Sequence, residues 1–414
     1  MDGLLPVVGE VSNRGMAQTR GPVYLPSVSP VCLRRSVELI LLVGVVILYA
    51  ASPITAWIAG GLLFATYGRK TAAIVWSFAS FMPIALVING SKEVAGDWAW
   101  YWRQFFEYQG LGLLDIFGKT MFPYNKLYEP LYFSSSWIIA NIVPGQVQFL
   151  IFWVLLLVYG NLTGVAFILS RYLELNAFRS LVLLYILFGF GITFTLVTHL
   201  VRQSIAVSLC TLAFILLLKN NRFGAALVAV LAVAIHTPAW VLAGAIFLGS
   251  HVFRRYGTRS FLGMATMGLI LGGAYWWFSG RGYAGANDGS VSLLVISVDL
   301  LVLVGLLWGV WKMPEPFWNL RGAVASVMIL QLAFVLGTIL EPLPALRFYL
   351  YVTPFTSLGA FALIDALLAK RLTRVLQAAF TALVGVGAVF LMQTRIMRAP
   401  FYFGIDIFDM LVLF

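Results

Sequence analysis

Long apolar stretches, separated by short groups of charged and turn-forming residues, make up most of this chain. Thirteen of them can be read from the sequence: 37–51, 54–67, 72–89, 147–170, 180–198, 203–218, 223–236, 238–250, 260–278, 291–311, 321–340, 348–368 and 375–393. An α-helix needs roughly 20 apolar residues to cross a bilayer. The pattern therefore predicts an all-α polytopic membrane protein with about 13 transmembrane helices.

Two of the apolar runs, 37–67 and 223–250, are too long for one crossing and short for two. Basic residues flank both ends of each run, as Arg35 and Arg69 do for the first. Because basic residues favour the cytoplasmic side, each run is predicted to return to its starting side as a tight, re-entrant or short hairpin.

Composition supports this class, since 61% of the residues are hydrophobic and only 10% are charged. That balance leaves no part of the chain for a soluble catalytic domain. The net charge of +11 arises from Lys and Arg in short loops, which is a topology signal, so nucleic acid is not an expected partner. With a cytoplasmic N-terminus, most of the 27 Lys and Arg residues fall inside, and the interval 90–146 falls outside.

The outer interval contains a segment rich in aromatic residues, from Trp98 to Tyr108. It is too polar to span the bilayer and is predicted to form a helix that lies in the outer interface. We accordingly expect a cytoplasmic segment 1–36, a multi-spanning domain 37–393 and an outer C-terminal segment 394–414.

Charged residues beside hydrocarbon are costly, so the acids on the outer side are candidates for a functional site. Asp97 precedes Tyr101 by about one helical turn, and its carboxylate could act as a general base or cap the helix it begins. Glu129 precedes Pro130, where it could cap a helix, pair with Lys126 or belong to the site.

Arg202 and Gln203 begin an apolar stretch at its outer end. The planar guanidinium of Arg202 suits two phosphate oxygens, whereas an Arg that merely extends toward the interface would not explain Gln203. His236, followed by Pro238, interrupts an apolar hairpin at its outer tip. An imidazole there can hold a proton or donate to a phosphate, and a structural His is the alternative.

A second outer arginine, Arg347, lies between Glu341 and Tyr351. Two arginines from separate helices would bind a pyrophosphate well, while an ion pair of Arg347 with Glu341 that fixes a loop is the alternative. Asp299, inside a span, and Asp288 are polar residues for which the sequence indicates no role.

The sequence contains no Walker loop, HExxH motif, Cys/His cluster or Gly-rich dinucleotide fingerprint. We therefore expect neither a cofactor nor a metal. The two cysteines, Cys32 and Cys210, predict no disulfide, because one precedes the first span and the other lies inside a span.

Several short motifs, taken in order, resemble those of the EpsG family of Wzy-like exopolysaccharide polymerases. The residues concerned are Gly96-Asp97 with Tyr101, Glu129-Pro130-Leu131-Tyr132, Arg202-Gln203-Ser204-Ile205-Ala206, Ile235-His236-Thr237-Pro238-Ala239, and Arg347 with Tyr351. The resemblance covers about residues 37–368, and the Arg-Gln and Ile-His motifs are its strongest parts.

The resemblance implies a membrane glycosyltransferase of the GT-C type. It would join oligosaccharide repeat units carried on undecaprenyl pyrophosphate at the outer, periplasmic face of the bacterial cytoplasmic membrane. Its partners would be the lipid-linked oligosaccharide and the lipid bilayer, with a chain-length regulator and a flippase of the same pathway as candidates.

Such a reaction needs a base for the acceptor hydroxyl and cations for the leaving pyrophosphate. The expected catalytic residues are Asp97, Glu129 and His236, with Asp97 as the first choice of base. The expected residues for pyrophosphate or glycan binding are Arg202, Gln203, Arg347, Tyr101, Tyr132 and Tyr351. Two guanidiniums can neutralise the pyrophosphate, so the reaction is expected to be independent of metal.

Two other functions stay open from the sequence. A lipid-linked glycan ligase, or another GT-C glycosyltransferase, would use the same residues and differ in product length. A flippase of lipid-linked glycans would carry charges along a two-sided pathway and show repeat symmetry, and neither is visible in the sequence.

Overall fold

The computed structural model describes residues 30–118, 129–192, 194, 197–198, 200–279, 293–312, 317–338, 348–368, 372–399, 402–405 and 407–411. Every named element in these ranges is a helix. The β-type pairing within them is one isolated antiparallel bridge between Lys92 and Phe403. The prediction of an all-α protein is therefore confirmed.

The chain divides into two compact units, Met1–Val43 and Gly44–Phe414. Helix α1 (Pro30–Ala51) begins in the first unit and ends in the second, which contains all the other named helices. The three regions predicted from the sequence, with boundaries at 36 and 393, stay predictions.

Helices of the second unit correspond to the predicted apolar stretches, and most of them, though not α8, agree with these stretches to within a few residues. They are α2 (Pro53–Thr66), α3 (Lys70–Gly90), α7 (Gln148–Tyr172), α8 (Ala177–Ile186), α9 (Val201–Leu218), α10 (Arg222–Ile235), α11 (Ala239–Tyr256), α12 (Ser260–Ser279), α13 (Leu293–Lys312), α14 (Trp318–Gly337), α16 (Thr353–Leu368) and α17 (Arg374–Met397). The interval 90–146 contains α4 (Gly96–Glu107), α5 (Asp115–Gly118) and α6 (Pro130–Ile142). Helix α4 covers the predicted aromatic helix.

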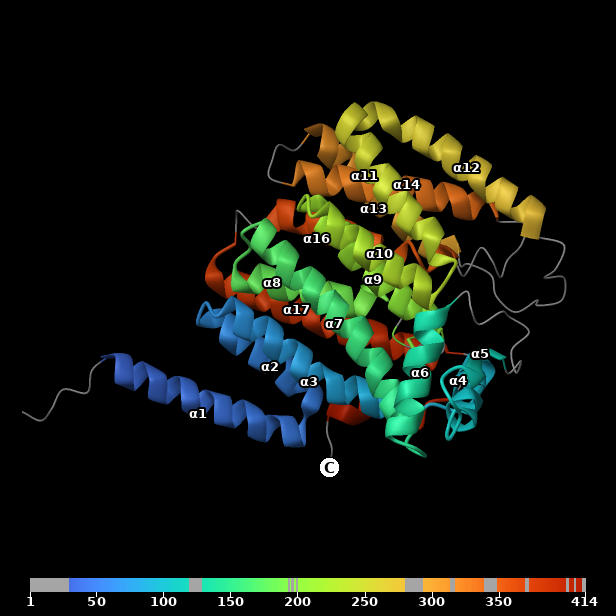
Figure 1. The fold of residues 1–414 in the computed structure, drawn as a ribbon. Helices are drawn as coiled ribbons and strands as arrows, with labels where there is room; N and C mark the ends of the chain where they lie inside the picture. The colour runs from blue at the N-terminus through green and yellow to red at the C-terminus, as the bar shows by residue number, and fades with distance from the viewer. Residues whose placement is uncertain are drawn as a thin grey trace, which may run out of the picture. The chain divides into compact units, whose positions relative to one another are not determined.

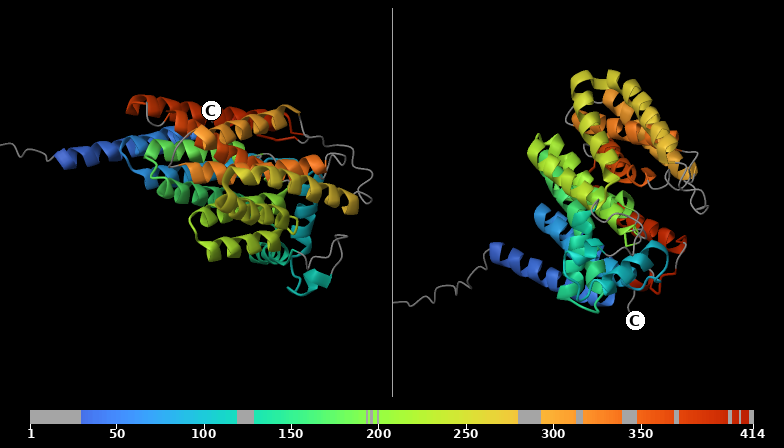
Figure 2. Two further views of the ribbon diagram at one scale, coloured as in Figure 1. Left: turned by 90° about the horizontal axis from the view of Figure 1, so that it is seen from above. Right: turned by 45° about the vertical axis from the view of Figure 1, so that its right-hand side comes forward.

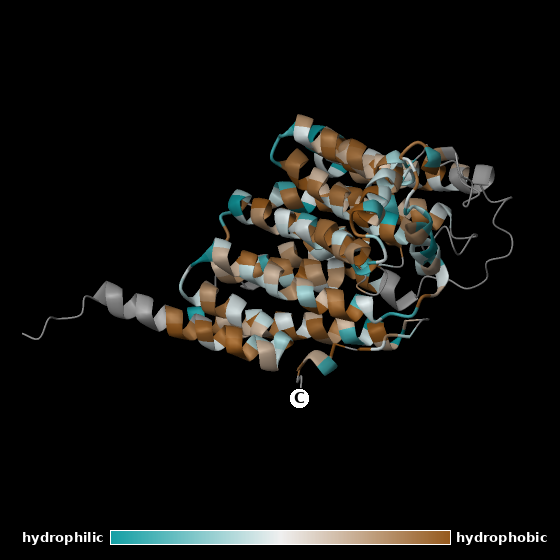
Figure 3. Ribbon diagram, turned by 60° about the horizontal axis from the view of Figure 1, so that its bottom comes forward, coloured by the Kyte–Doolittle hydropathy of each residue, from teal (hydrophilic) through white to brown (hydrophobic). Residues whose placement is uncertain are grey.

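Among the described residues, five helices are long and apolar enough to cross a membrane: α3, α7, α9, α14 and α17. Figure 3 shows apolar residues along the helices and polar residues gathered near helix ends and links. Large apolar side chains such as Leu262 and Val375 are more than three-quarters exposed, as expected where a helix faces lipid. The chain is an integral membrane protein.

Neighbouring helices in the second unit pack in a chain that leads from α2 to α11. Helix α3 packs against α2 and α7, α7 packs against α9, and α9 packs against α10 and α11 (Figures 1 and 2). Helices α12 and α14 approach closely because glycine lies between them. A Cβ atom at Gly272 would lie 2.3 Å from the carbonyl oxygen of Phe334, so a larger residue could not be placed there.

The hairpin predicted for 223–250 is present. Helix α10 ends at Ile235 and α11 begins at Ala239, and the two helices pack against each other. The link between them contains His236 and Pro238, and His236 has extended backbone angles. The link therefore places the polar side chain of His236 between two apolar helices.

The stretch 180–198 is predicted as one span, and this prediction is wrong. Helix α8 ends at Ile186, and a π-helical turn, η2 (Leu187–Gly191), is followed by extended backbone at Ile192. Glycine and β-branched residues dominate the second half of the stretch and have low helix propensity. The chain therefore leaves the helix about half-way along this apolar run.

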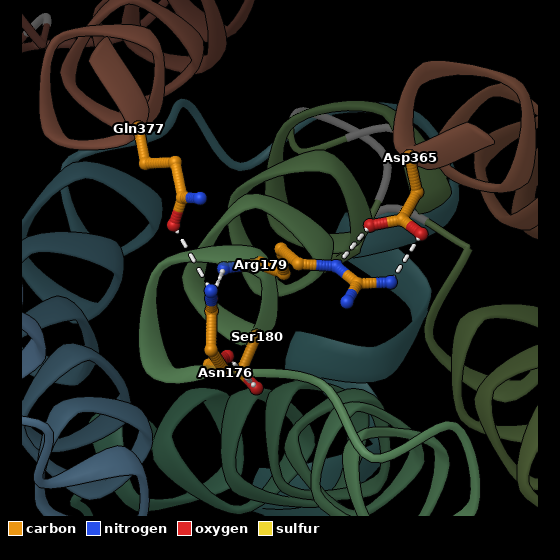
Figure 4. A network of polar contacts seen from close by, with 5 residues as sticks. All are labelled: Asn176, Arg179, Ser180, Asp365 and Gln377. Atoms are coloured by element: carbon orange, nitrogen blue, oxygen red, sulfur yellow. Dashed lines mark hydrogen bonds and ion pairs between the residues drawn. The ribbon is translucent and has the colours of Figure 1, made fainter. Parts of the chain in front are cut away.

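A polar network ties α8 to α16 and α17. Nε and Nη2 of Arg179 donate to the two carboxylate oxygens of Asp365, each at 2.5 Å (Figure 4). The Asn176 side chain caps α8 by accepting from the backbone N–H of Arg179 at 3.0 Å, and it donates to Gln377 at 2.9 Å. The network thus joins the start of α8 to two consecutive helices much later in the sequence.

We expect Asp365→Asn to lower the free energy of unfolding by about 2 kcal/mol. Breaking a fully buried pair costs 3–5 kcal/mol and an exposed pair contributes at most about 1 kcal/mol. We expect an intermediate cost for the Arg179–Asp365 pair, because the Arg179 side chain is 25% exposed and that of Asp365 is 3% exposed. Unfolding in detergent measures the effect, with Glu174→Gln at an exposed turn as the control. Equal stability of wild type and Asp365→Asn would contradict the prediction.

Candidate active site

Glu129 lies at the centre of a buried polar cluster. Helix α6 begins at Pro130, so Glu129 is the N-cap residue, but its carboxylate makes no capping bond. Its Oε1 lies 2.9 Å from Nδ1 of His236 and accepts from the backbone N–H of Thr237 at 3.2 Å. Its Oε2 accepts from Nη1 of Arg202. Glu129 is only 7% exposed, so these three contacts replace the water it would otherwise bind.

Arg202 is the second residue of α9 and its guanidinium points into the protein, toward α4 and α6. Besides the ion pair with Glu129, its Nε donates to the hydroxyl of Tyr101 at 3.2 Å. The cation lies over the rings of Tyr101 and Tyr132, with distances of 5.8 and 5.9 Å to the centroids. The two phenol rings are themselves in edge-to-face contact at 5.6 Å. This arrangement fixes the guanidinium in one orientation.

His236 enters the cluster from the link between α10 and α11. An ionised carboxylate accepts hydrogen bonds only, so the contact with Glu129 favours a proton on Nδ1 of the imidazole. In the neutral ring, Nε2 then keeps its lone pair. The side chain of His236 is 16% exposed, so a substrate group can reach it.

Burial and the charges of the cluster determine the protonation states of Glu129 and Tyr101. Burial tends to raise the pKa of Glu129, but the hydrogen bond with His236 and the positive charge of Arg202 outweigh burial and hold this pKa below its usual value. Burial raises the pKa of Tyr101 despite the opposing effect of Arg202. At neutral pH the carboxylate is therefore ionised and the phenol is neutral.

Asp97 lies on the same helix as Tyr101. Helix α4 begins at Gly96 with Ala95 as its N-cap residue, so Asp97 occupies the first turn and not the capping position considered from the sequence. Its negative charge adds to the rise in the pKa of Tyr101, which lies four residues later on the same helix. Its role as a base stays a prediction.

The other predicted residues take different positions. Gln203 is 5% exposed and, with Ser204 and Thr353, lines a small pocket on the neighbouring face of α9. Tyr351 is 1% exposed and packs edge-to-face on Phe348, with centroids 5.7 Å apart. Thus the described residues bring Tyr101, Glu129, Tyr132, Arg202 and His236 into one cluster. Arg347, Glu341 and Lys126 lie outside the described residues.

Lys92 is a buried residue beside the cluster that the sequence did not single out. It is 5% exposed, its Nζ donates to the hydroxyl of Thr198 at 2.9 Å, and it lies 5.8 Å from the ring centroid of Trp98. Trp98 precedes Tyr101 by about one turn of α4, and Thr198 lies just before α9, the helix of Arg202. Lys92 thus contacts the same two segments that the hydrogen bond between Tyr101 and Arg202 joins. Burial lowers the pKa of Lys92 to about 7. In sequence it resembles any Lys that flanks a span, so no pattern distinguishes it.

Comparison with known proteins relates this cluster to a family. The family model of the EpsG family matches residues 74–402, which include every described member of the cluster. The match begins later and extends further than the resemblance read from the motifs. Searches of curated proteins and of solved structures found no match. Because the family model covers most of the chain, this protein belongs to the EpsG family.

Proposed function

We propose that this protein is a polysaccharide polymerase, a glycosyltransferase that joins oligosaccharide repeat units carried on undecaprenyl pyrophosphate. The observation that carries the proposal is the carboxylate of Glu129, which binds both Arg202 and His236 inside a membrane protein of the EpsG family. Buried ionisable residues in a membrane protein are costly and commonly serve function. The cluster combines a candidate base with a candidate cation for a phosphate.

In the proposed reaction, the oxygen of an acceptor hydroxyl attacks the anomeric carbon of the donor unit. The bond from that carbon to the pyrophosphate oxygen breaks, and its electron pair leaves with undecaprenyl pyrophosphate. Nε2 of His236 accepts the hydroxyl proton, and Glu129 orients the imidazole and stabilises its protonated form. Asp97, the first choice of base from the sequence, is the alternative acceptor of this proton.

Arg202 would stabilise the charge that develops on the departing pyrophosphate. Its guanidinium has five N–H donors, and the contacts with Glu129 and Tyr101 use two of them. The remaining donors can bind phosphate oxygens while the first two hold the side chain in place. The scheme uses no metal, which predicts polymer formation in the presence of a chelator.

The finer architecture is also part of the proposal. We propose about 13 spans, a GT-C-like arrangement and an active site on the periplasmic side of the bacterial cytoplasmic membrane. Hydrogen bonds from Glu93 N–H to the Tyr402 carbonyl, and from Gly404 N–H to the Ser91 carbonyl, support placing the C-terminal segment at the same end as α4. Both would then face outside.

This orientation predicts the labelling of engineered cysteines in a variant without Cys32 and Cys210. A cysteine in place of Asn125 should react with an impermeant thiol reagent in intact cells. A cysteine in place of Arg255, which is exposed at the proposed inner end, should react only after permeabilisation. The reverse pattern would contradict the orientation.

Product length separates the polymerase from a ligase. The purified protein in nanodiscs is incubated with lipid-linked repeat units, and the products are separated by size. A ladder of many units supports a polymerase, whereas a single transfer to a different acceptor supports a ligase or another glycosyltransferase. Movement of the intact lipid-linked unit across the bilayer, with no new linkage, would support a flippase.

A further inference from the structure

A second arginine lies at the same end of the protein as the cluster. Arg395 is near the C-terminal end of α17, and the segment that follows pairs with residues 91–93, just before α4. Its Nη1 donates to the carbonyl oxygen of Gly189 at 2.9 Å. Arg395 is partly exposed. Its position is therefore fixed by a neutral group, and other N–H donors remain for a ligand.

The π-helical turn η2 makes this contact. Its backbone leaves the regular helical pattern, so the carbonyl of Gly189 is available to Arg395. Close approach of α17 requires glycine here, because a Cβ atom at Gly189 would lie 2.7 Å from Cβ and 2.9 Å from Cα of Ala388. The turn η2 and the close packing of α17 against it thus fix the position of Arg395.

Tyr159 lies against the same turn η2 as Arg395, since its ring contacts that of Phe188 at a centroid distance of 5.0 Å, and Phe188 precedes Gly189. The positive charge of Arg395 acts on the hydroxyls of Tyr159 and Tyr349. Tyr349 donates to Asp299, the intramembrane acid for which the sequence indicates no role. Tyr159 is 0% exposed, and its hydroxyl has no hydrogen-bond partner among the described residues. A buried hydroxyl without a hydrogen-bond partner destabilises the folded state, so a ligand that accepts a hydrogen bond from it would be favoured.

Within the part of the chain that the structure describes, no acid pairs with the charge of Arg395, whereas Glu129 pairs with that of Arg202. Arg202 is paired with Glu129, but no carboxylate of the described residues lies within ion-pair distance of Arg395. An uncompensated guanidinium inside a membrane protein favours an anionic ligand. Arg395 is therefore better suited than Arg202 to hold a phosphate that is not cleaved.

One pocket is lined by residues that neighbour Arg202 and the turn η2. Gln203, next to Arg202, lines it together with Thr353, whose hydroxyl donates to the carbonyl of Gly191 at 2.9 Å. Gly191 ends the same turn η2 that holds Arg395 through Gly189. The pocket therefore adjoins both the helix that carries Arg202 and the turn that holds Arg395.

We propose that Arg395 and the hydroxyl of Tyr159 bind a second pyrophosphate, that of the acceptor unit. This inference rests on the proposed function, in which two lipid-linked units meet and each carries a pyrophosphate. Arg202 lies beside His236, where the donor bond breaks, so Arg395 is the position for the pyrophosphate that stays attached. Both groups can then be bound at once without sharing one guanidinium.

The test counts the molecules of undecaprenyl pyrophosphate bound to purified protein by native mass spectrometry, with undecaprenol as the control lipid. We expect wild type to bind two molecules and Arg395→Gln to bind the second at least tenfold more weakly. Tyr159→Phe should weaken it several-fold. Arg398→Gln, which removes the same charge from an exposed position one turn later, should bind as wild type does.

Arg395→Lys keeps the charge and a donor for Gly189, so it covers the case in which the Gln variant does not fold. We expect it to bind the second molecule less tightly than wild type, since one amine cannot replace the planar fork. Two molecules bound equally well by Arg395→Gln and wild type, or only one bound by wild type, would overturn the inference.

Polymer formation, measured on the same preparations, distinguishes this inference from the proposed function. A wild-type protein that binds two molecules in an Arg395-dependent way but forms no linkage would refute the polymerase and leave the binding role of Arg395 in place. A protein that forms polymer while Arg395→Gln binds both molecules would leave the polymerase in place and refute the second site.

Discussion

Glu129→Gln is expected to reduce polymer formation by about 10²–10³-fold while the chain stays folded. The amide is similar in size to the carboxylate but carries no charge, so it cannot stabilise a protonated His236 or neutralise Arg202. Positioned acid–base groups contribute about 10²–10⁴-fold in rate, and the imidazole here depends on its carboxylate partner. The measurement is the initial rate of linkage formation in nanodiscs.

Glu174→Gln is the matched control for this variant. Glu174 is exposed at a turn between α7 and α8 and has no contact with the cluster. Its replacement should leave the rate within twofold of wild type. If Glu129→Gln also retains the wild-type rate, the carboxylate does not orient the base, and Asp97 becomes the residue to test next.

Arg202→Lys is expected to lose about a hundredfold in rate with little change in stability. A lysine keeps the charge but cannot hold Glu129 and Tyr101 and still present two parallel donors to a pyrophosphate. The loss of one such contact from a transition state costs roughly 3 kcal/mol. The assay contains a chelator, so a metal cannot replace the missing guanidinium contact.

Arg103→Lys provides the control, because Arg103 is an exposed arginine on α4, close in sequence to Tyr101. It should behave as wild type. A wild-type rate for Arg202→Lys would mean that the guanidinium has only a structural role. Activity that appears only after Mg²⁺ is added would contradict the metal-independent scheme.

The helices were predictable because a bilayer imposes a simple rule on sequence. Runs of apolar residues bounded by charged residues give the positions of α3, α7, α9 and α17 to within a few residues. The rule fails at η2, where the run stays apolar but the backbone leaves the helix. Hydropathy carries no information on backbone conformation. The carbonyls of Gly189 and Gly191 accept hydrogen bonds from Arg395 of α17 and Thr353 of α16, and a hydropathy pattern does not predict these partners.

The members of the cluster were also predictable, but their pairing was not. Glu129, Arg202 and His236 stand out because each is a costly residue beside an apolar run, and the family motifs include them. That Glu129 joins the other two depends on how α6, α9 and the link after α10 pack together. Lys92 and Arg395 were missed for a related reason. Each resembles a basic residue that flanks a span. Only burial distinguishes Lys92, and only its bond to the turn η2 distinguishes Arg395.

The most direct test follows linkage formation and the release of undecaprenyl pyrophosphate together in one reaction. Purified wild-type protein in nanodiscs is given lipid-linked repeat units, with Glu129→Gln run in parallel. We expect a ladder of products, one undecaprenyl pyrophosphate released for each linkage, and loss of both in Glu129→Gln. No linkage with wild type, or an undiminished ladder with Glu129→Gln, would contradict it.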